Sequence, residues 1–121
     1  MTAPINNIDK RSYGFALQII QINNNLQNVH KEFTLSKQLL RSGTSIGANI
    51  REAKFAQSDA DFISKLSISL KEANETQYWL ELLHDSGYLD DNTFNSIYGE
   101  SKEITAILVT IIKKLKNKVE E

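Results

Sequence analysis

Proline is absent from almost the whole chain, and this constrains the fold more than any other feature. The single proline is Pro4, so 117 consecutive residues run without the side chain that breaks helices. Only five glycines interrupt them. A chain of 121 residues is long enough to bury a core without disulfides or a metal, and it contains no cysteine to form either a disulfide or a thiolate site. We therefore expect one all-α domain over residues 1–121.

The spacing of apolar residues predicts four amphipathic helices, at about residues 9–31, 35–56, 59–85 and 92–119. In each, apolar or small residues recur at steps of three and four, which places them on one inner stripe. These stripes are Phe15, Ile19, Ile22, Leu26, Val29, Phe33; Leu35, Leu39, Gly43, Ile46, Ile50, Ala53; Phe62, Leu66, Ser69, Ala73, Thr76, Leu80, Leu83; and Ile97, Ile104, Leu108, Ile111, Leu115. Short connections favour an antiparallel up-and-down four-helix bundle.

Capping residues mark the starts of two of these helices. Asp9 is a candidate N-cap of the first helix, with Ile8 and Tyr13 at the spacing of a hydrophobic staple. Ser58 and Asp61 stand at the spacing of a capping box before the third helix. We interpret Asp59 and Asp61 as helix-dipole partners rather than metal ligands.

Small residues fill the middle of the second helix, from 42 to 49. Gly43 and Gly47 each cost about 1 kcal/mol relative to alanine in a helix, so their presence suggests close approach of another backbone. The alternative is a break between two shorter helices. The apolar period keeps its phase across the glycines, which favours one continuous helix. Gly87 stands where the third helix needs a left-handed residue to end.

A second apolar face appears on the outer sides of the second and third helices. A bundle monomer buries one stripe per helix, so a further stripe that includes a tryptophan predicts contact between subunits. The predicted subunit-contact residues are Arg41, Thr44, Ala48, Arg51, Phe55, Ile68, Glu72, Glu75, Tyr78, Trp79 and Leu82.

The net charge of −1 conceals an uneven distribution. Residues 1–57 carry seven basic and three acidic side chains, and residues 58–121 carry seven basic and twelve acidic ones. Arginines on the second helix, Arg41 and Arg51, therefore have Glu72 or Glu75 as candidate partners. These pairs form either between neighbouring subunits or within one chain.

No arrangement of residues predicts catalysis, a metal site or a cofactor. His30 is interpreted as a structural histidine near the inner stripe, and His84 as a cation that favours a helix C-terminus. Di-iron bundles require inward Glu-x-x-His motifs on two helices, whereas this spacing occurs once here, at Glu81 and His84. No segment has the length and hydropathy of a membrane span, and Met1 to Asp9 lack the pattern of a signal peptide. We expect a non-enzymatic cytoplasmic protein without a membrane partner.

Two segments resemble a known family. They are QLLRSGTSIGANIREA at 38–53 and KLSISLKEANETQYWLELL at 65–83. Both are similar to the four-helix-bundle proteins encoded within intervening sequences of bacterial 23S ribosomal RNA genes. The resemblance implies a ring-like homopentamer, with no established activity. A related bundle, the accessory variability protein of diversity-generating retroelements, is a basic pentamer that binds nucleic acid and a reverse transcriptase.

That relation raises RNA, DNA or a nucleic-acid enzyme as partners, although the near-neutral charge of this chain argues against strong nonspecific binding. Local basic patches remain, and assembly would repeat them. Ion pairing within the protein is the favoured interpretation for those on the second helix, and the lysines near residue 118 have a second interpretation as cations that favour a helix C-terminus. A purely protein-binding scaffold is the alternative function, and a further alternative is a ligand-binding protein or enzyme with its site in the bundle core. The candidate phosphate contacts are Lys37, Arg41, Arg51, Lys54, Lys113, Lys114, Lys116 and Lys118.

Overall fold

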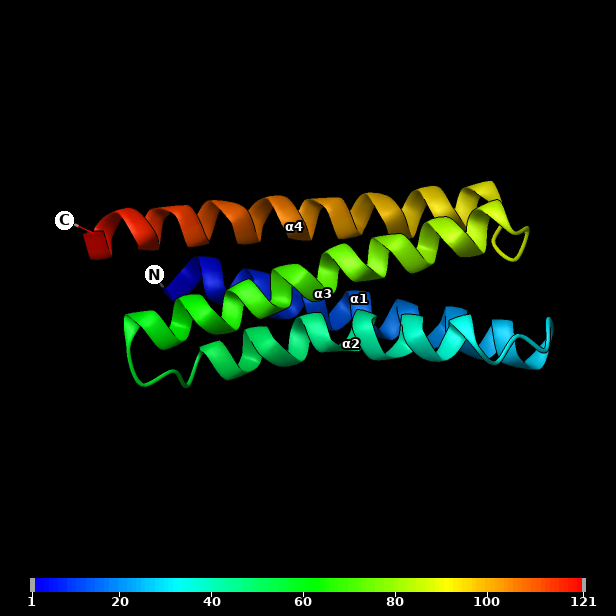
Figure 1. Ribbon diagram of the computed structural model, residues 1–121, viewed down its shortest axis with the longest axis horizontal. Helices are drawn as coiled ribbons and strands as arrows, with labels where there is room; N and C mark the ends of the chain where they lie inside the picture. Colours follow the sequence, from blue (N-terminus) through cyan, green and yellow to red (C-terminus); the bar gives the residue numbers. More distant parts are fainter. Residues whose placement is uncertain (1, 121) are drawn as a thin grey trace.

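A computed structural model describes residues 2–120 as four helices and their connections (Figure 1). The helices are α1 (Thr2–Asn28), α2 (Leu35–Ala53), α3 (Asp59–Asp85) and α4 (Asp91–Glu120). No strand occurs within the described residues. Successive helices run in opposite directions, so the start of α1 and the end of α4 lie at the same end of the molecule. The predicted all-α class is confirmed.

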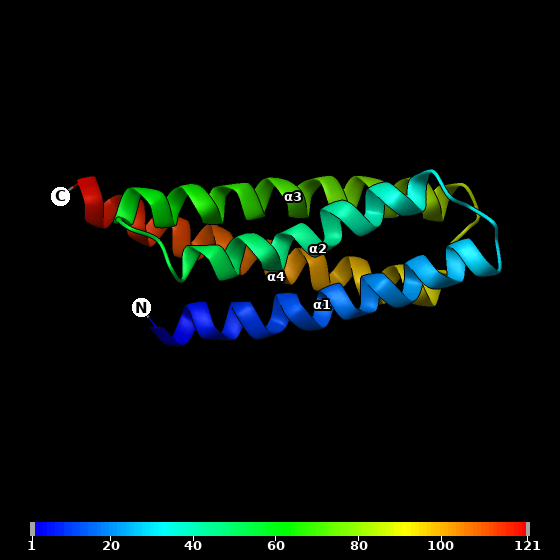
Figure 2. The same cartoon turned by 90° about the horizontal axis from the view of Figure 1, so that it is seen from below.

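The four helices pack around one core, but they do not pack equally. Four pairs of helices are in contact: α1 with α2, α2 with α3, α3 with α4, and α1 with α4. Of these four pairs, α1 and α4 have the weakest contact. α1 and α3 form one diagonal of the bundle and α2 and α4 form the other, as the view in Figure 2 shows. The seam between α1 and α4 is therefore the loosest of the four.

The core confirms most of the predicted inner stripes. On α2, α3 and α4 every predicted residue is buried except Leu35 and Phe62, which are partly buried. Hydroxyl groups within the core bond to neighbouring helices: Ser69 Oγ donates to the Ile46 carbonyl at 2.8 Å, and Thr76 Oγ1 donates to Ser42 Oγ at 3.0 Å. The core is thus apolar with a few small polar residues, some of which bond between helices, whereas Ser12 and Ser101 bond to carbonyls of their own helices.

The predicted start of α1 at Asp9 is wrong, because the helix begins seven residues earlier at Thr2. Pro4 lies in the first turn, where a missing N–H leaves no helical hydrogen bond unmade. Asp9 therefore lies inside the helix rather than at its cap. The proposed staple is wrong as well, since Ile8 is fully buried and Tyr13 is 54% exposed.

The predicted end of α1 at residue 31 is also wrong, because the helix stops at Asn28. Lys31 adopts a left-handed backbone conformation with φ 55°, and the Glu32 N–H donates to the Leu26 carbonyl at 2.9 Å, which reverses the chain. Val29, 65% exposed, and Phe33, 50% exposed, consequently leave the inner stripe to which they were assigned.

The carboxylate of Glu32 caps α2. It accepts hydrogen bonds from the N–H groups of Thr34, Leu35 and Ser36 at 3.3, 3.1 and 2.8 Å. The N–H groups at a helix start lack acceptors within the helix, and the Glu32 carboxylate supplies acceptors for the three named here. At its other end α2 stops at Ala53, three residues before the predicted end, because the next three N–H groups bond to carbonyls three residues back rather than four.

The other helix ends agree closely with prediction. α3 spans the predicted residues, and Ser58 Oγ accepts from the Asp61 N–H at 3.1 Å as the capping box requires. Gly87 has φ 87°, which confirms its left-handed conformation. α4 begins one residue earlier than predicted, and the Asp90 carboxylate accepts from the Thr93 N–H at 2.7 Å.

The two glycines of α2 lie against α1, and α2 is continuous across them as predicted. A Cβ placed on Gly43 would lie 2.9 Å from both γ carbons of Ile19, and one on Gly47 would lie 3.1 Å from Ser12 Oγ. Ile19 is fully buried and has little room to move. The glycines therefore allow the close contact between α1 and α2.

We expect Gly43→Ala to lower the free energy of unfolding by about 1–2 kcal/mol, because the clash with Ile19 outweighs the gain in helix propensity. Gly14→Ala and Gly99→Ala are matched controls, since a Cβ at either position meets nothing within 4 Å. The free energy of unfolding of those two variants should rise by up to about 1 kcal/mol. Urea unfolding measures all three, and a stabilised Gly43→Ala variant would contradict the close packing.

Candidate functional site

The outer side of α3 exposes part of the predicted apolar stripe. Tyr78 is 56% exposed and Ile68 is also exposed, whereas Trp79 and Leu82 are half-buried. Trp79 packs against the core of its own chain, and its Nε1 donates to Glu75 Oε2 at 3.1 Å. Tyr78 and Ile68 are thus the members of this stripe that are most available to a partner.

The outer side of α2 exposes fewer apolar groups than the pattern predicted. The hydroxyl of Thr44 donates to the Leu40 carbonyl at 2.7 Å within the same helix, and Ala48 presents a single methyl group. Phe55 lies just beyond the end of α2 and is 81% exposed, which makes it the most exposed large apolar side chain of the described residues.

A further apolar stripe, on α1, escaped the sequence analysis. Tyr13, Leu17 and Ile20 follow one another at steps of four and three and are all exposed. The guanidinium of Arg51 lies over the Tyr13 ring, 5.5 Å from its centre, so the stripe adjoins the outer side of α2. The spacing of three and four residues also indicates this stripe in the sequence, but Tyr13 stands at the spacing of a hydrophobic staple as well, and that spacing favours a different interpretation.

The predicted pairing of Arg41 occurs within one chain. Its Nη1 lies 3.2 Å from Glu72 Oε2, and its Nη2 contacts Glu75 Oε2, which links α2 to α3. Arg51 does not pair with either glutamate but with Asp9, 42 residues away in the sequence.

Asp9 is buried between α1 and α2 and holds two cations. Its Oδ1 lies 3.2 Å from Arg51 Nη2, and its Oδ2 lies 3.0 Å from Lys54 Nζ. Burial alone would raise the pKa of Asp9, but the hydrogen bonds and charges of Lys54 and Arg51 outweigh it and lower the pKa below the usual 3.8. The carboxylate therefore fixes two of the residues proposed to contact phosphate.

Folding separates charge along the axis of the bundle. The half that contains the start of α1 and the end of α4 (residues 2–15, 45–71 and 106–120) carries ten Lys or Arg and five Asp or Glu. The other half (16–44 and 72–105) carries four Lys or Arg and nine Asp or Glu. We call these the basic half and the acidic half. Long-range attraction of an anion therefore favours the basic half.

The eight candidate phosphate contacts are divided by this separation. Lys37 and Arg41 lie in the acidic half, away from the rest. Arg51 and Lys54 lie in the basic half together with four exposed lysines of α4 and with Lys10 of α1. Within residues 4–118 no ion pair involves the α4 lysines, which are Lys113, Lys114, Lys116 and Lys118.

The two histidines take structural positions at the other end of the molecule. His84, in the last turn of α3, has Nε2 2.8 Å from Asp91 Oδ1, and this hydrogen bond raises the pKa of the imidazole above 6.5. The expected inward position of His30 is wrong, because α1 ends before it and its exposed ring meets Tyr88 edge to face.

Among the described side chains no group of three His, Asp or Glu is placed to hold a metal ion. None of the described helices is both long and apolar enough to cross a membrane.

The fold and these surfaces define the class of the protein as an all-α four-helix bundle with charged and apolar outer faces. A sequence profile of the 23S rRNA-intervening sequence protein family matches residues 6–110, and the chain belongs to this family. A crystal structure of a protein of unknown function from the S23 ribosomal protein family of Bacteroides thetaiotaomicron is 55% identical. The match covers 91% of this chain and 98% of that one, with a TM-score of 0.90. Comparison with curated proteins finds no match.

We expect Asp9→Asn to lower the free energy of unfolding at pH 7 by about 1–3 kcal/mol, because it leaves two cations without their shared carboxylate. The pKa of Asp9 is lowered in the folded state, so its contribution is complete above the unfolded value of about 3.9 and is lost as pH falls through the lower folded value. Urea unfolding at pH 7 and at pH 2–3 measures the difference. A deficit that stays constant with pH would contradict the ion-pair role.

Proposed function

We propose that this protein is a non-enzymatic homo-oligomer that acts as an interaction scaffold. The observation that carries the proposal is the apolar surface left uncovered on three helices, by Tyr13, Leu17 and Ile20 of α1, by Phe55 after α2, and by Ile68 and Tyr78 of α3. Exposed aromatic and aliphatic groups at regular helical spacing are typical of subunit contacts.

The positions of these stripes support a ring. α1 and α3 are diagonal helices, so their outer stripes belong to different sides of the bundle. Contact between the α1 stripe of one subunit and the α3 stripe of the next is heterologous, and repetition of such a contact closes into a ring when the rotation allows. Resemblance to the ring-forming bundles favours five subunits.

A second proposed activity, contact with RNA, rests on the charge separation. The four α4 lysines gather at one end of each subunit, whereas Lys10 lies nearer the middle, beside Ile107, and a ring of parallel subunits would repeat the α4 cluster around one face. The family to which the chain belongs takes its name from an intervening sequence of 23S rRNA, which makes RNA the partner to test first.

The oligomer is tested by changing Tyr78 to Lys, which places a charge in the proposed contact. We expect sedimentation velocity at micromolar concentration to show an oligomer for the wild type and smaller species for Tyr78→Lys. Val29→Lys is a matched control, because Val29 is exposed but lies outside the apolar stripes. A wild-type protein that is strictly monomeric would refute the scaffold proposal.

RNA contact is tested with two triple variants that remove the same charge. Lys113, Lys114 and Lys116 changed to Gln remove cations from the basic half, and Lys31, Lys37 and Lys102 changed to Gln remove them from the acidic half. The slope of log K against log salt for single-stranded RNA should fall by about 0.7 per lost phosphate contact in the first variant only. Equal effects, or no binding at low salt, would favour a purely protein-binding scaffold.

A further inference from the structure

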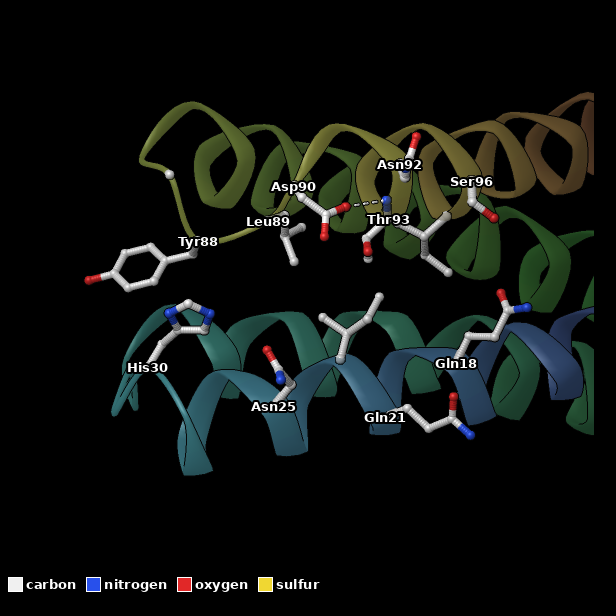
Figure 3. A pocket seen from close by; sticks show the side chains of 13 residues that line it. Gln18, Gln21, Asn25, His30, Tyr88, Leu89, Asp90, Asn92, Thr93 and Ser96 are labelled. Carbon is white, nitrogen blue, oxygen red and sulfur yellow. Dashed lines mark hydrogen bonds between the residues drawn. The ribbon is translucent and has the colours of Figure 1, made fainter.

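An open cleft of about 750 Å³ lies in the acidic half, between α1 and the region that joins α3 to α4 (Figure 3). It opens along the loosest seam of the bundle. Asn25 extends from α1 toward the α3–α4 connection, and Gln18 and Ser96 extend from opposite walls. The volume is in the range of sites that hold drug-sized ligands, roughly 300–1,000 Å³.

The lining of the cleft combines uncharged polar groups with an apolar floor. Carboxamides and hydroxyls supply both donors and acceptors, from Gln18, Gln21, Asn25, Asn92, Thr93 and Ser96. Ile22, Leu89 and Ile97 supply the apolar surface, and no lysine or arginine lines the cleft. A matching ligand is therefore uncharged, carries donors and acceptors together, and has an apolar face.

One end of the cleft adds aromatic rings and a carboxylate. The rings of His30 and Tyr88 lie 5.8 Å apart, edge to face. Asp90 accepts the Thr93 N–H at 2.7 Å, and its carboxylate retains capacity for hydroxyl donors from a ligand. The N–H of Thr93 holds the pKa of Asp90 below its usual value, so this group is negative at neutral pH and repels phosphate.

We propose that this cleft binds an uncharged nucleoside. A nucleobase has a flat apolar face for the isoleucines and rings, and an edge of alternating donors and acceptors that carboxamides such as that of Asn25 recognise. The vicinal hydroxyls of a ribose match the free lone pairs of Asp90. The same chemistry occurs in a free nucleoside and in an unpaired nucleotide of a strand, and the acidic surroundings favour the free nucleoside.

The test uses the full chain and saturation-transfer NMR with adenosine, uridine and their 5′-monophosphates. We expect a nucleoside to bind and its monophosphate to bind at least tenfold more weakly, because the Asp90 carboxylate that lines the cleft repels the added charge. Asn25→Leu and Gln21→Leu should each weaken binding at least fivefold. Asn24→Leu is the matched control, since Asn24 is exposed on the same helix but does not line the cleft.

Several results would overturn this proposal. They are no binding of either nucleoside at millimolar concentration, equal affinity for the monophosphates, preference for a single-stranded oligonucleotide, and equal effects of Asn24→Leu and Asn25→Leu. Protection of Tyr88 from hydroxyl radicals on oligomerisation, without ligand, would assign the cleft to a second copy of the chain. Loss of RNA binding in the lysine variant with nucleoside binding intact would separate this site from the proposed RNA contact.

Discussion

The close contact of α2 with α1 determines how the rest of the bundle is arranged. At Gly43 the backbone of α2 is close enough to Ile19 that a methyl group does not fit. The neighbouring Ser42 forms a hydrogen bond with Thr76 of α3. Small residues of α2 therefore make contacts with both α1 and α3. Because α2 is held between α1 and α3, these three helices form a compact unit, and α4 completes it mainly through α3.

The loose seam between α1 and α4 follows from this arrangement. The side of α1 that faces α4 carries the polar Gln18 and Asn25 as well as Ile22, and α4 contributes the small Ser96 beside Ile97. Where the two helices do meet, the contact includes an exposed ion pair, with Arg11 Nε 2.7 Å from Glu100 Oε2. Exposed pairs contribute little to stability, so this seam tolerates a cleft that the contact between α1 and α2 would not.

Local patterns in the sequence predicted most of the helices but not all of their ends. The inner stripes of α2, α3 and α4 and the cap at Ser58 depend on spacings of three and four residues, which are visible in one sequence. The end of α1 depends on a left-handed lysine, which residue type alone does not indicate. Asp9 has the residue type of a cap, but its partners Arg51 and Lys54 are 42 and 45 residues away, and only the packed structure brings them together. The cleft lies beyond local patterns for the same reason, because its walls come from α1 and α4.

The separation of charge shows how topology changes the meaning of a sequence pattern. Halving the chain grouped Lys37 and Arg41 with Arg51, yet the antiparallel course of the helices sends the two ends of α2 to opposite ends of the bundle. The same course brings the lysines of α4 beside the start of α1. In the proposed ring of parallel subunits, the basic ends would share one face and the clefts would lie nearer the other. A phosphate chain would then be attracted to the basic end of the molecule and repelled by the acidic half. An uncharged ligand is not repelled there, so it would bind in the cleft at the opposite end.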